Sequence, residues 1–248
     1  MNISNKTVLI TGGGSGIGFA VAKQLTEKGN KVIITGRSEA RLKDAAAKLG
    51  NVDIFACDIT KADDVSKLLS YISEKYSNLD VLINNAGQAS VYQLTADTSG
   101  YENAGAEIAT NYLAPINLID KLLPTLSKQA EAAIVNVTSV LAIAPSYDVP
   151  TYSASKAALH SYTQALRFSL AKSSPSVKVF ELMPPLVDTE FSAEIGGSNG
   201  IPASQVADEL LAGLESDTVE IHVGFTAQFY DAYLKSPDDA FLMLNSRR

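Results

Sequence analysis

Short runs of apolar, mostly β-branched residues alternate with stretches of helical spacing along most of this chain, and this alternation constrains the fold more than any other feature. The strand candidates cover residues 7–10, 31–35, 52–57, 80–84, 133–138, 177–183 and 219–223. Apolar residues recur with helical spacing over 16–28, 38–49, 62–75, 153–171 and 203–215. The runs between residues 8 and 83 are continuously apolar, which indicates strands covered on both faces. Strand–helix alternation then predicts right-handed crossovers in a parallel sheet.

The predicted fold class is therefore α/β: a single-domain, doubly wound parallel sheet of about seven strands with helices on both faces. The chain has 248 residues, and no repeat, low-complexity segment or linker divides it. Its least regular segments are 88–104, 184–202 and the tail from Ser236, near or after strand C-termini, where open α/β sheets place their sites. Pro115 falls inside a helix expected over about 107–123, which predicts a kink or a displaced helix start.

Composition excludes several classes of protein. Hydrophobic residues make up 46% and charged residues 19%, and the net charge is −7 with basic residues scattered, which argues against nucleic acid or an anionic membrane as partner. No apolar run approaches eighteen residues and the start lacks the regions of a signal peptide, so we expect a cytoplasmic protein. Cys57 is the single cysteine, so the chain cannot form an internal disulfide. Its simplest role is that of a small residue in the core. His160 and His222 lack metal-ligand companions nearby, so no metal site is predicted.

A glycine-rich turn follows the first strand, as Thr11-Gly-Gly-Gly-Ser-Gly-Ile-Gly18, and precedes an amphipathic helix. Glycines let backbone N–H groups approach a pyrophosphate, and the helix N-terminus contributes partial positive charge. The spacing is T-G-x-x-x-G-x-G rather than G-x-G-x-x-G. The alternative is a flexible turn or a plain helix cap.

Tyr152 and Lys156 are four residues apart on a predicted helix, so they share one face. An ammonium there is expected to lower the pKa of the phenol and to make Tyr152 a proton donor and acceptor. Ser139 stands thirteen residues upstream, at an apparent strand end. Together these residues predict chemistry at a carbonyl or an alcohol.

Further segments complete a recognisable order: Asn84-Asn85-Ala86-Gly87 after a strand, Asn111 within Asn-Tyr-Leu-Ala, and Ser139 within Val-Thr-Ser-Val. With them the chain resembles the short-chain dehydrogenase/reductase family, from its first strand to about the end of the helix that carries Lys156 and more loosely beyond. Within the family it is similar to bacterial DltE-like oxidoreductases. The resemblance implies a single NAD(P)-binding Rossmann domain over residues 1–248, a small-molecule ketone or alcohol as substrate, and a homodimer or homotetramer.

The resemblance also implies roles for four catalytic residues. Tyr152 gives its proton to the substrate oxygen during hydride transfer, and takes it back in oxidation. Lys156 lowers the pKa of Tyr152 and binds the nicotinamide ribose, while Ser139 holds the carbonyl oxygen. Asn111 positions a water that links Lys156 to solvent. The structural alternatives are that Asn111 satisfies a helix kink and that Ser139 caps a loop.

Coenzyme contacts are implied along the carboxyl edge of the sheet. The set is Gly12, Ser15, Gly16, Ile17, Gly18, Arg37, Asp58, Ile59, Asn85, Ala86, Gly87, Tyr152, Lys156, Val187 and Thr189. Asn84 is expected to brace its strand instead. Where the family has Pro-Gly after the sixth strand, this chain has Pro184-Pro185, which exchanges a flexible residue for a fixed φ and a lost donor.

The second strand ends in Thr35-Gly36-Arg37-Ser38, without the carboxylate that usually binds the ribose 2′-hydroxyl of NAD. Arg37, with Ser38, suits a 2′-phosphate instead. Many NADP-preferring relatives have a second basic residue in the glycine turn, at the position where this chain has Ser15. NADP(H) is therefore favoured, and NAD(H) stays possible. Asp58 resembles the family's acceptor for the adenine amino group. Alternatively, Arg37 is a solvated helix-start residue and Asp58 belongs to a helix N-terminal turn.

The substrate side is expected to be mostly apolar and without a cation to clamp an acid. The predicted lining is Gln88, Ser90, Val91, Leu141, Ile143, Tyr147, Leu186, Phe191 and Ile195. This favours a neutral ketone, aldehyde or secondary alcohol. The substrate loop is placed at about 185–202, where Gly196-Gly-Ser-Asn-Gly200 is either a lid hinge or a loop without gating. In the tail, about 236–248, Phe241-Leu-Met-Leu244 is expected to bury against a neighbouring subunit.

Two other functions stay open. A catalytically silent dinucleotide-binding sensor or scaffold would show erosion of the serine, tyrosine or lysine, and all three are present. A sugar-nucleotide epimerase or dehydratase would need a longer substrate domain and a different glycine spacing.

Overall fold

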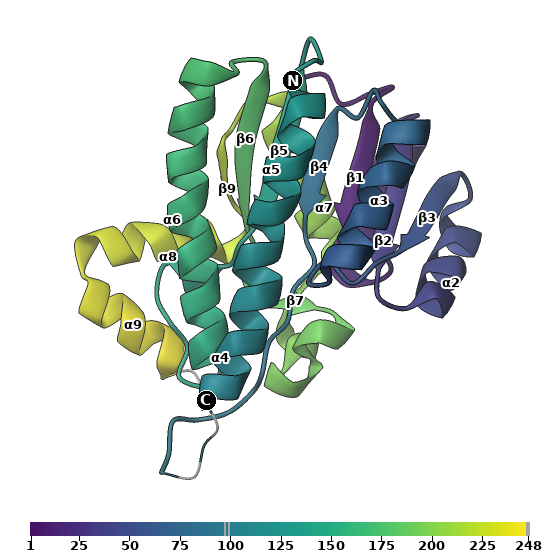
Figure 1. Cartoon of the computed structure of the whole chain (residues 1–248). Helices are drawn as coiled ribbons and strands as arrows, with labels where there is room; N and C mark the ends of the chain where they lie inside the picture. The colour runs from purple at the N-terminus through teal and green to yellow at the C-terminus, as the bar shows by residue number, and fades with distance from the viewer. Residues whose placement is uncertain (97, 99, 247–248) are drawn as a thin grey trace.

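The structure is a computed structural model that describes residues 1–96, 98 and 100–246. Seven parallel strands form one sheet in the order β3-β2-β1-β4-β5-β6-β9 (Figure 1). Their bounds are β1 (Thr7–Thr11), β2 (Lys31–Gly36), β3 (Val52–Ala56), β4 (Val81–Asn84), β5 (Ala132–Val137), β6 (Val177–Met183) and β9 (Glu220–His222). All seven predicted strands are thus present, with ends that differ by a residue or two. Two short strands, β7 (Val187–Asp188) and β8 (Ile201–Pro202), form a separate pair that was not predicted.

Helices cover both faces of the sheet, which confirms the predicted fold class. The long helices are α1 (Gly16–Glu27), α2 (Glu39–Leu49), α3 (Ala62–Lys75), α4 (Gly100–Ile108), α5 (Ala114–Leu126), α6 (Pro150–Ser173), α7 (Ala203–Glu215), α8 (Phe225–Lys235) and α9 (Pro237–Asn245). Short turns of helix are η1 (Ala109–Leu113), η2 (Val140–Ala142), η3 (Glu190–Ile195) and η4 (Gly197–Asn199). Within the described residues, no helix combines the length and the apolar character needed to cross a membrane.

Each central strand sends alternate side chains into two separate cores. Val8 and Ile10 pack with α1, α2 and α7, whereas Leu9 between them packs with α3, α5 and α6. Figure 1 shows α3, α5 and α6 lying over one face of the sheet. Since side chains alternate along a strand, a strand covered on both faces must be apolar throughout, as these sequences are.

The strand order reverses at β1, which pairs with β2 on one side and β4 on the other. Ligands of open α/β sheets bind at such a switch point, beyond the carboxyl ends of the strands. The loops after β1 and β4 therefore meet where a ligand would lie.

The helix expected around Pro115 is divided. A single π-helical turn, η1, separates α4 from α5, and Pro115 stands in the first turn of α5. Proline is tolerated there because its missing N–H is not needed in a first turn. The prediction was a kink or a displaced helix start, and the structure has a π-turn that interrupts the helix just before Pro115; this π-turn holds Asn111.

Two of the three segments predicted as least regular contain more helix than expected. Helix α4 begins at Gly100, inside the segment 88–104, of which residues 97 and 99 lie outside the described part. The tail forms α9, capped by Ser236, whose side chain accepts a hydrogen bond from Asp239 N; residues 247–248 lie outside the described part. Apolar residues of α8 and α9 form a small core with the loop after β5, within the same chain.

Candidate active site

The glycine turn after β1 is shaped by close approach of backbone to backbone. Gly12 has φ +66°, and a Cβ there would lie 2.9 Å from Ala86 Cα. At Gly18 a Cβ would lie 2.4 Å from the Gly12 carbonyl oxygen, so this glycine lets α1 pack against the turn. Asn85 Nδ2 donates to the carbonyl oxygens of Thr11 and Gly12 at 3.0 and 3.1 Å. The loop after β4 thus braces the turn after β1.

A cavity of about 640 Å³ runs along the carboxyl edge of the sheet. It is lined by loops that follow β1, β2, β3, β4, β5 and β6. The predicted site residues that line it are Gly12, Ser15, Gly16, Ile17, Arg37, Asp58, Ile59, Asn85, Ala86, Gly87, Ser139, Tyr152, Lys156, Val187 and Thr189. Gly18 and Asn111 do not line it; Gly18 packs behind the turn and Asn111 is fully buried.

One end of the cavity carries Arg37 and Asp58. Burial opposes ionisation of Asp58, but hydrogen bonds from the Thr60 hydroxyl and amide and the charge of Arg37 outweigh it and hold the pKa of this carboxyl below its usual value. Asp58 is thus a carboxylate in a tight turn before α3. The Ser38 hydroxyl accepts a hydrogen bond from the Arg41 amide at 3.3 Å, so it caps α2.

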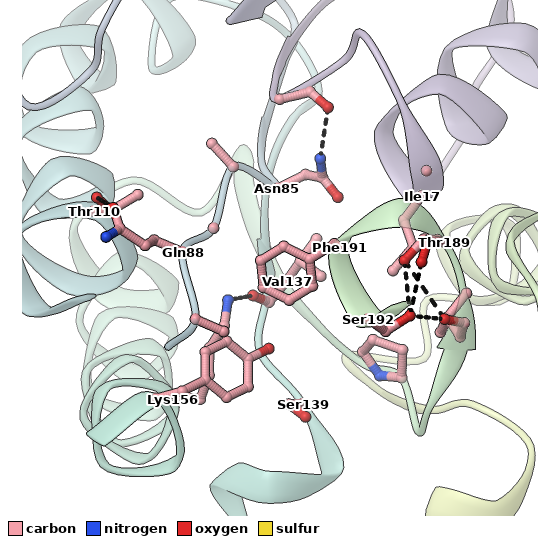
Figure 2. A pocket seen from close by; sticks show the side chains of 18 of the residues that line it. Ile17, Asn85, Gln88, Thr110, Val137, Ser139, Lys156, Thr189, Phe191 and Ser192 are labelled. Atoms are coloured by element: carbon pink, nitrogen blue, oxygen red, sulfur yellow. Dashed lines mark hydrogen bonds between the residues drawn. The ribbon is translucent and has the colours of Figure 1, made fainter. Parts of the chain in front are cut away.

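The other end carries Ser139, Tyr152 and Lys156, of which Figure 2 labels Ser139 and Lys156. Tyr152 and Lys156 lie one turn apart near the start of α6, with the Lys156 Nζ 5.6 Å from the centre of the Tyr152 ring. The Lys156 Nζ donates to the Val137 carbonyl oxygen at 2.8 Å. Ser139 follows β5 and its hydroxyl accepts a hydrogen bond from the Leu141 amide at 3.1 Å. Ser139 therefore caps η2, as the structural alternative expected, and also faces the phenol.

The protonation of these groups differs from the prediction. Burial raises the pKa of the Tyr152 phenol, the charge of Glu107 raises it further, and the hydrogen bond with Ser139 lowers it only in part. The predicted lowering is therefore wrong in this structure, because desolvation outweighs every group that favours the phenolate. Burial lowers the pKa of Lys156 to about 8, against the charge of Glu181. At neutral pH Tyr152 is a phenol and Lys156 is mainly an ammonium.

Asn111 uses its side chain to hold the loop after β4. Its Oδ1 accepts from the Gln88 amide, and its Nδ2 donates to the Gln88 carbonyl oxygen and to the Ser155 hydroxyl, each at 2.8 Å. The amide side chain thus ties the π-turn η1 to that loop and to α6. These partners lie in the loop after β4 and on α6 rather than in the helix of Asn111 itself, so the side chain braces the site, and a role in placing water stays a prediction.

The predicted substrate side is found in part. Gln88, Val91, Leu141, Leu186, Phe191 and Ile195 line the cavity. Ser90, Ile143 and Tyr147 do not: the Ser90 amide donates to Glu107, Ile143 packs against the C-terminal helices, and the Tyr147 amide donates to Asn245. Among the described residues, no three His, Cys, Asp or Glu side chains gather in a way that could hold a metal ion.

Two residues at this end were missed from the sequence. Leu244 of α9 lines the cavity, because Met243 and Leu244 pack against the chain's own small core, whereas Phe241 and Leu242 stay exposed and their burial against a neighbouring subunit stays a prediction. Glu107 is fully buried, and its Oε1 accepts from the Ser90 amide at 2.6 Å while Oε2 has no hydrogen-bond partner. Glu107 could have been identified as an acidic residue on the buried side of a helix. No local sequence feature identifies Leu244 as a cavity residue.

The segment between β6 and α7 is folded over the cavity. The Ser192 hydroxyl donates to the carbonyl oxygens of Val187 and Thr189 (Figure 2). Glu190 forms an ion pair of 2.8 Å with Arg41 of α2. This segment is thus joined to the half of the molecule that carries the glycine turn.

Comparisons with known proteins agree with this geometry. The family model for short chain dehydrogenases matches residues 6–199. The chain is 39% identical over 252 residues to the uncharacterized oxidoreductase DltE of Bacillus subtilis (strain 168), which covers 100% of this chain and 99% of that protein.

Solved structures are similar over most of the chain. A short chain dehydrogenase from Burkholderia cenocepacia J2315 in complex with NADP has a TM-score of 0.85 at 30% identity and covers 98% of each chain. The 3-ketoacyl-(acyl-carrier-protein) reductase from Brucella melitensis complexed with NADH has a TM-score of 0.78 at 27% identity, over 86% of this chain and 91% of that one.

Proposed function

The chain belongs to the short-chain dehydrogenase family, and on that premise we propose that it is an NAD(P)(H)-dependent oxidoreductase acting on a neutral ketone or aldehyde, or on the corresponding alcohol. One observation carries the proposal: Ser139, Tyr152 and Lys156 converge at one end of a cavity whose wall includes the glycine turn. A dinucleotide held along that wall has its reactive end beside these groups. We likewise propose that residues 1–248 act as one NAD(P)-binding domain.

The residues present fit a dinucleotide. Gly12, Gly16 and Gly87 line the cavity with bare backbone, and a Cβ at Gly16 would lie 3.1 Å from the Thr189 side chain. Backbone N–H groups at the start of α1 suit a pyrophosphate. Lys156 would bind the nicotinamide ribose, and Val187 and Thr189 would contact the carboxamide and phosphate.

In reduction the bound coenzyme supplies a hydride to the carbonyl carbon. Tyr152 donates its proton to the carbonyl oxygen, which balances the charge and yields the alcohol; oxidation reverses both transfers. Ser139 donates a hydrogen bond to the same oxygen, so developing negative charge meets a preorganised donor. The Lys156 ammonium stabilises the phenolate that proton donation leaves. Because the pKa of Tyr152 is raised, the phenol is protonated at neutral pH, which supports reduction.

For the coenzyme we propose a preference for NADP(H), with NAD(H) as a poorer alternative. Arg37 lines the cavity after β2, and the sequence at the end of that strand, Thr35-Gly36-Arg37-Ser38, contains no carboxylate. The similar Burkholderia structure contains NADP, whereas the similar Brucella structure contains NADH. Coenzyme competition would therefore decide between them.

The substrate end favours neutral molecules. Among the described residues that line the cavity, the basic side chains are Arg37 at the far end and Lys156 in the catalytic group. Glu194 lines it near Phe191 and would repel an anion, whereas Glu190 is paired with Arg41. We propose that the loop at about 185–202 closes this end over a partly apolar carbonyl compound, and that the assembly is a homodimer or homotetramer.

The test is the initial rate of NADPH and NADH oxidation with a panel of neutral aryl and alkyl ketones and aldehydes. Tyr152→Phe keeps the ring but removes the proton, so turnover should fall at least about a hundredfold while coenzyme still binds. Tyr162→Phe is the matched control, since Tyr162 lies on the same helix but packs in the core below α6. Retained turnover in Tyr152→Phe would refute the assignment, and coenzyme binding without turnover on the panel or on the reverse alcohols would favour a silent dinucleotide-binding protein.

A further inference from the structure

A row of polar side chains crosses the sheet beneath α6, where apolar residues would be expected. Asn84, Asn136, Glu181 and Glu220 occupy paired positions on the adjacent strands β4, β5, β6 and β9. Asn84 Nδ2 donates to Asn136 Oδ1 at 2.9 Å, which joins the first two members of the row, and Asn136 Nδ2 donates to the Thr163 hydroxyl of α6 at 2.9 Å. The Glu181 side chain is 0% exposed. A buried carboxylate is costly unless it is well paired, so its partners decide its effect.

Partners from two elements hold the Glu181 carboxylate. His160 Nδ1 lies 2.9 and 3.0 Å from the two carboxylate oxygens, and the Thr138 hydroxyl donates to Oε1 at 2.7 Å. The Arg167 guanidinium lies 3.9 Å from Oε2. His160 and Arg167 both come from α6, and Thr138 follows β5 directly.

Further charged and titratable side chains lie around the Glu181 carboxylate. Arg167 makes its shorter ion pair with Glu220 of β9, at 2.8 Å. The titratable and charged groups that face Glu181 are thus Lys156, His160 and Arg167 from α6, and Glu220 and His222 from β9. The side chains of His160, Arg167 and Glu220 are 25%, 21% and 31% exposed, so the network reaches from the surface to the buried Glu181.

This network adjoins the catalytic group through consecutive residues at the end of β5. His160 stands four residues after Lys156 on α6, on the same face of the helix. The Lys156 Nζ donates to the Val137 carbonyl oxygen, and the next residue, Thr138, donates to Glu181. Lys156 is 3% exposed. Burial lowers its pKa to about 8, and the charge of Glu181 is the one that opposes this lowering.

We propose that Glu181 is a positioning residue whose buried carboxylate keeps Lys156 a cation beside Tyr152. The inference rests on the proposed function, in which a charged Lys156 stabilises the phenolate that Tyr152 becomes. His160 and Arg167 allow Glu181 to stay an ion in the core, and their exposed edges join it to solvent. Without Glu181, the effect of burial on Lys156 would be unopposed, and the pKa of Lys156 would fall further below its usual value.

The test measures Lys156 directly, by carbon-13 NMR titration of lysine-labelled protein without substrate, with Lys156→Arg identifying the resonance. In Glu181→Gln the pKa of Lys156 should fall by about one unit or more. Glu220→Gln is the matched control, because Glu220 also pairs with Arg167 but its removal leaves Glu181 in place; the pKa of Lys156 should stay within about 0.3 units. Glu181→Asp keeps the charge and should restore most of the shift. An unchanged pKa in Glu181→Gln overturns the proposal.

A second readout separates this inference from the proposed function. Activity that needs charged Lys156 is lost as pH rises through its pKa, so the alkaline limb of kcat/KM should move to lower pH in Glu181→Gln. Wild-type protein without turnover would refute the proposed function, and the NMR titration would still decide the role of Glu181.

If Glu181→Gln does not fold, the double variant Glu181→Gln/His160→Gln leaves neither partner as an unpaired ion. The same fall in the pKa of Lys156 is expected there, and an unchanged value overturns the proposal.

Discussion

Substituting alanine at Gly18 tests whether the glycine turn and α1 are packed as tightly as the structure indicates. The new Cβ would lie 2.4 Å from the Gly12 carbonyl oxygen and 2.5 Å from Asn85 Nδ2. Ordinary contacts begin near 3.4 Å, so the turn must move away from α1 by about 1 Å. That movement breaks the hydrogen bond between Asn85 and Gly12.

The magnitude follows from three contributions. Overpacking costs about 1–3 kcal/mol, and the lost hydrogen bond costs about 0.5–1.5 kcal/mol. Alanine gains about 0.5–1 kcal/mol over glycine inside a helix, which roughly cancels the hydrogen bond. The free energy of unfolding should therefore fall by about 1–3 kcal/mol. In a chain of this size, each kcal/mol lost lowers Tm by about 2–4 °C.

Thermal and urea unfolding of Gly18→Ala, beside Gly105→Ala, measure this. Gly105 also lies inside a helix, α4, but a Cβ there meets nothing within 4 Å. Gly105→Ala should therefore be slightly more stable than the parent, by about 0.5–1 kcal/mol. NADPH fluorescence should also show weaker coenzyme binding to Gly18→Ala only. If the two variants are equally stable, the close packing of α1 on the turn is refuted.

Three further predictions concern charge. Glu107→Gln removes a negative charge that raises the pKa of Tyr152, so that pKa should fall in a tyrosine NMR titration; an unchanged value would contradict the coupling. Arg37→Leu should raise the KM for NADPH about 10- to 100-fold and leave that for NADH nearly unchanged, and equal losses for both coenzymes would exclude a 2′-phosphate site at Arg37. The hydrogen bond with Glu181 raises the pKa of His160, so its stabilisation is full below about pH 6.5 and is lost as pH rises through the raised pKa. His160→Asn should therefore destabilise more at pH 6 than at pH 9 in urea unfolding, and an equal loss at both would refute this linkage.

The strands and most helices could be predicted because their signals are local. The run 177–183 is apolar enough to identify β6 to the residue, and the helical spacing over 203–215 matches α7. Helices α8 and α9 were missed, because each is short and depends on packing against the loop after β5. Propensity is a weak guide where tertiary contacts supply most of the stability.

Most of the predicted site residues do line one cavity, because motif residues at strand ends meet whenever the strands are parallel. The two exceptions, Gly18 and Asn111, are held by contacts with the scaffold. Gly18 is needed for the contact of α1 with Gly12, and the Asn111 side chain is occupied by Gln88 and Ser155. Sequence spacing places a residue near a site but does not tell whether its side chain faces the ligand or the scaffold.

By itself the sequence determined the alternation of strands and helices, the close turn after β1, and the pairing of Tyr152 with Lys156 on one helical face. These features depend on residues within one or two turns of each other. Only the tertiary structure decided that burial raises the pKa of Tyr152, and that Asn136, Glu181 and Glu220 line up beneath α6. Register between strands far apart in sequence brings these groups together, and the desolvation they share depends on everything packed around them.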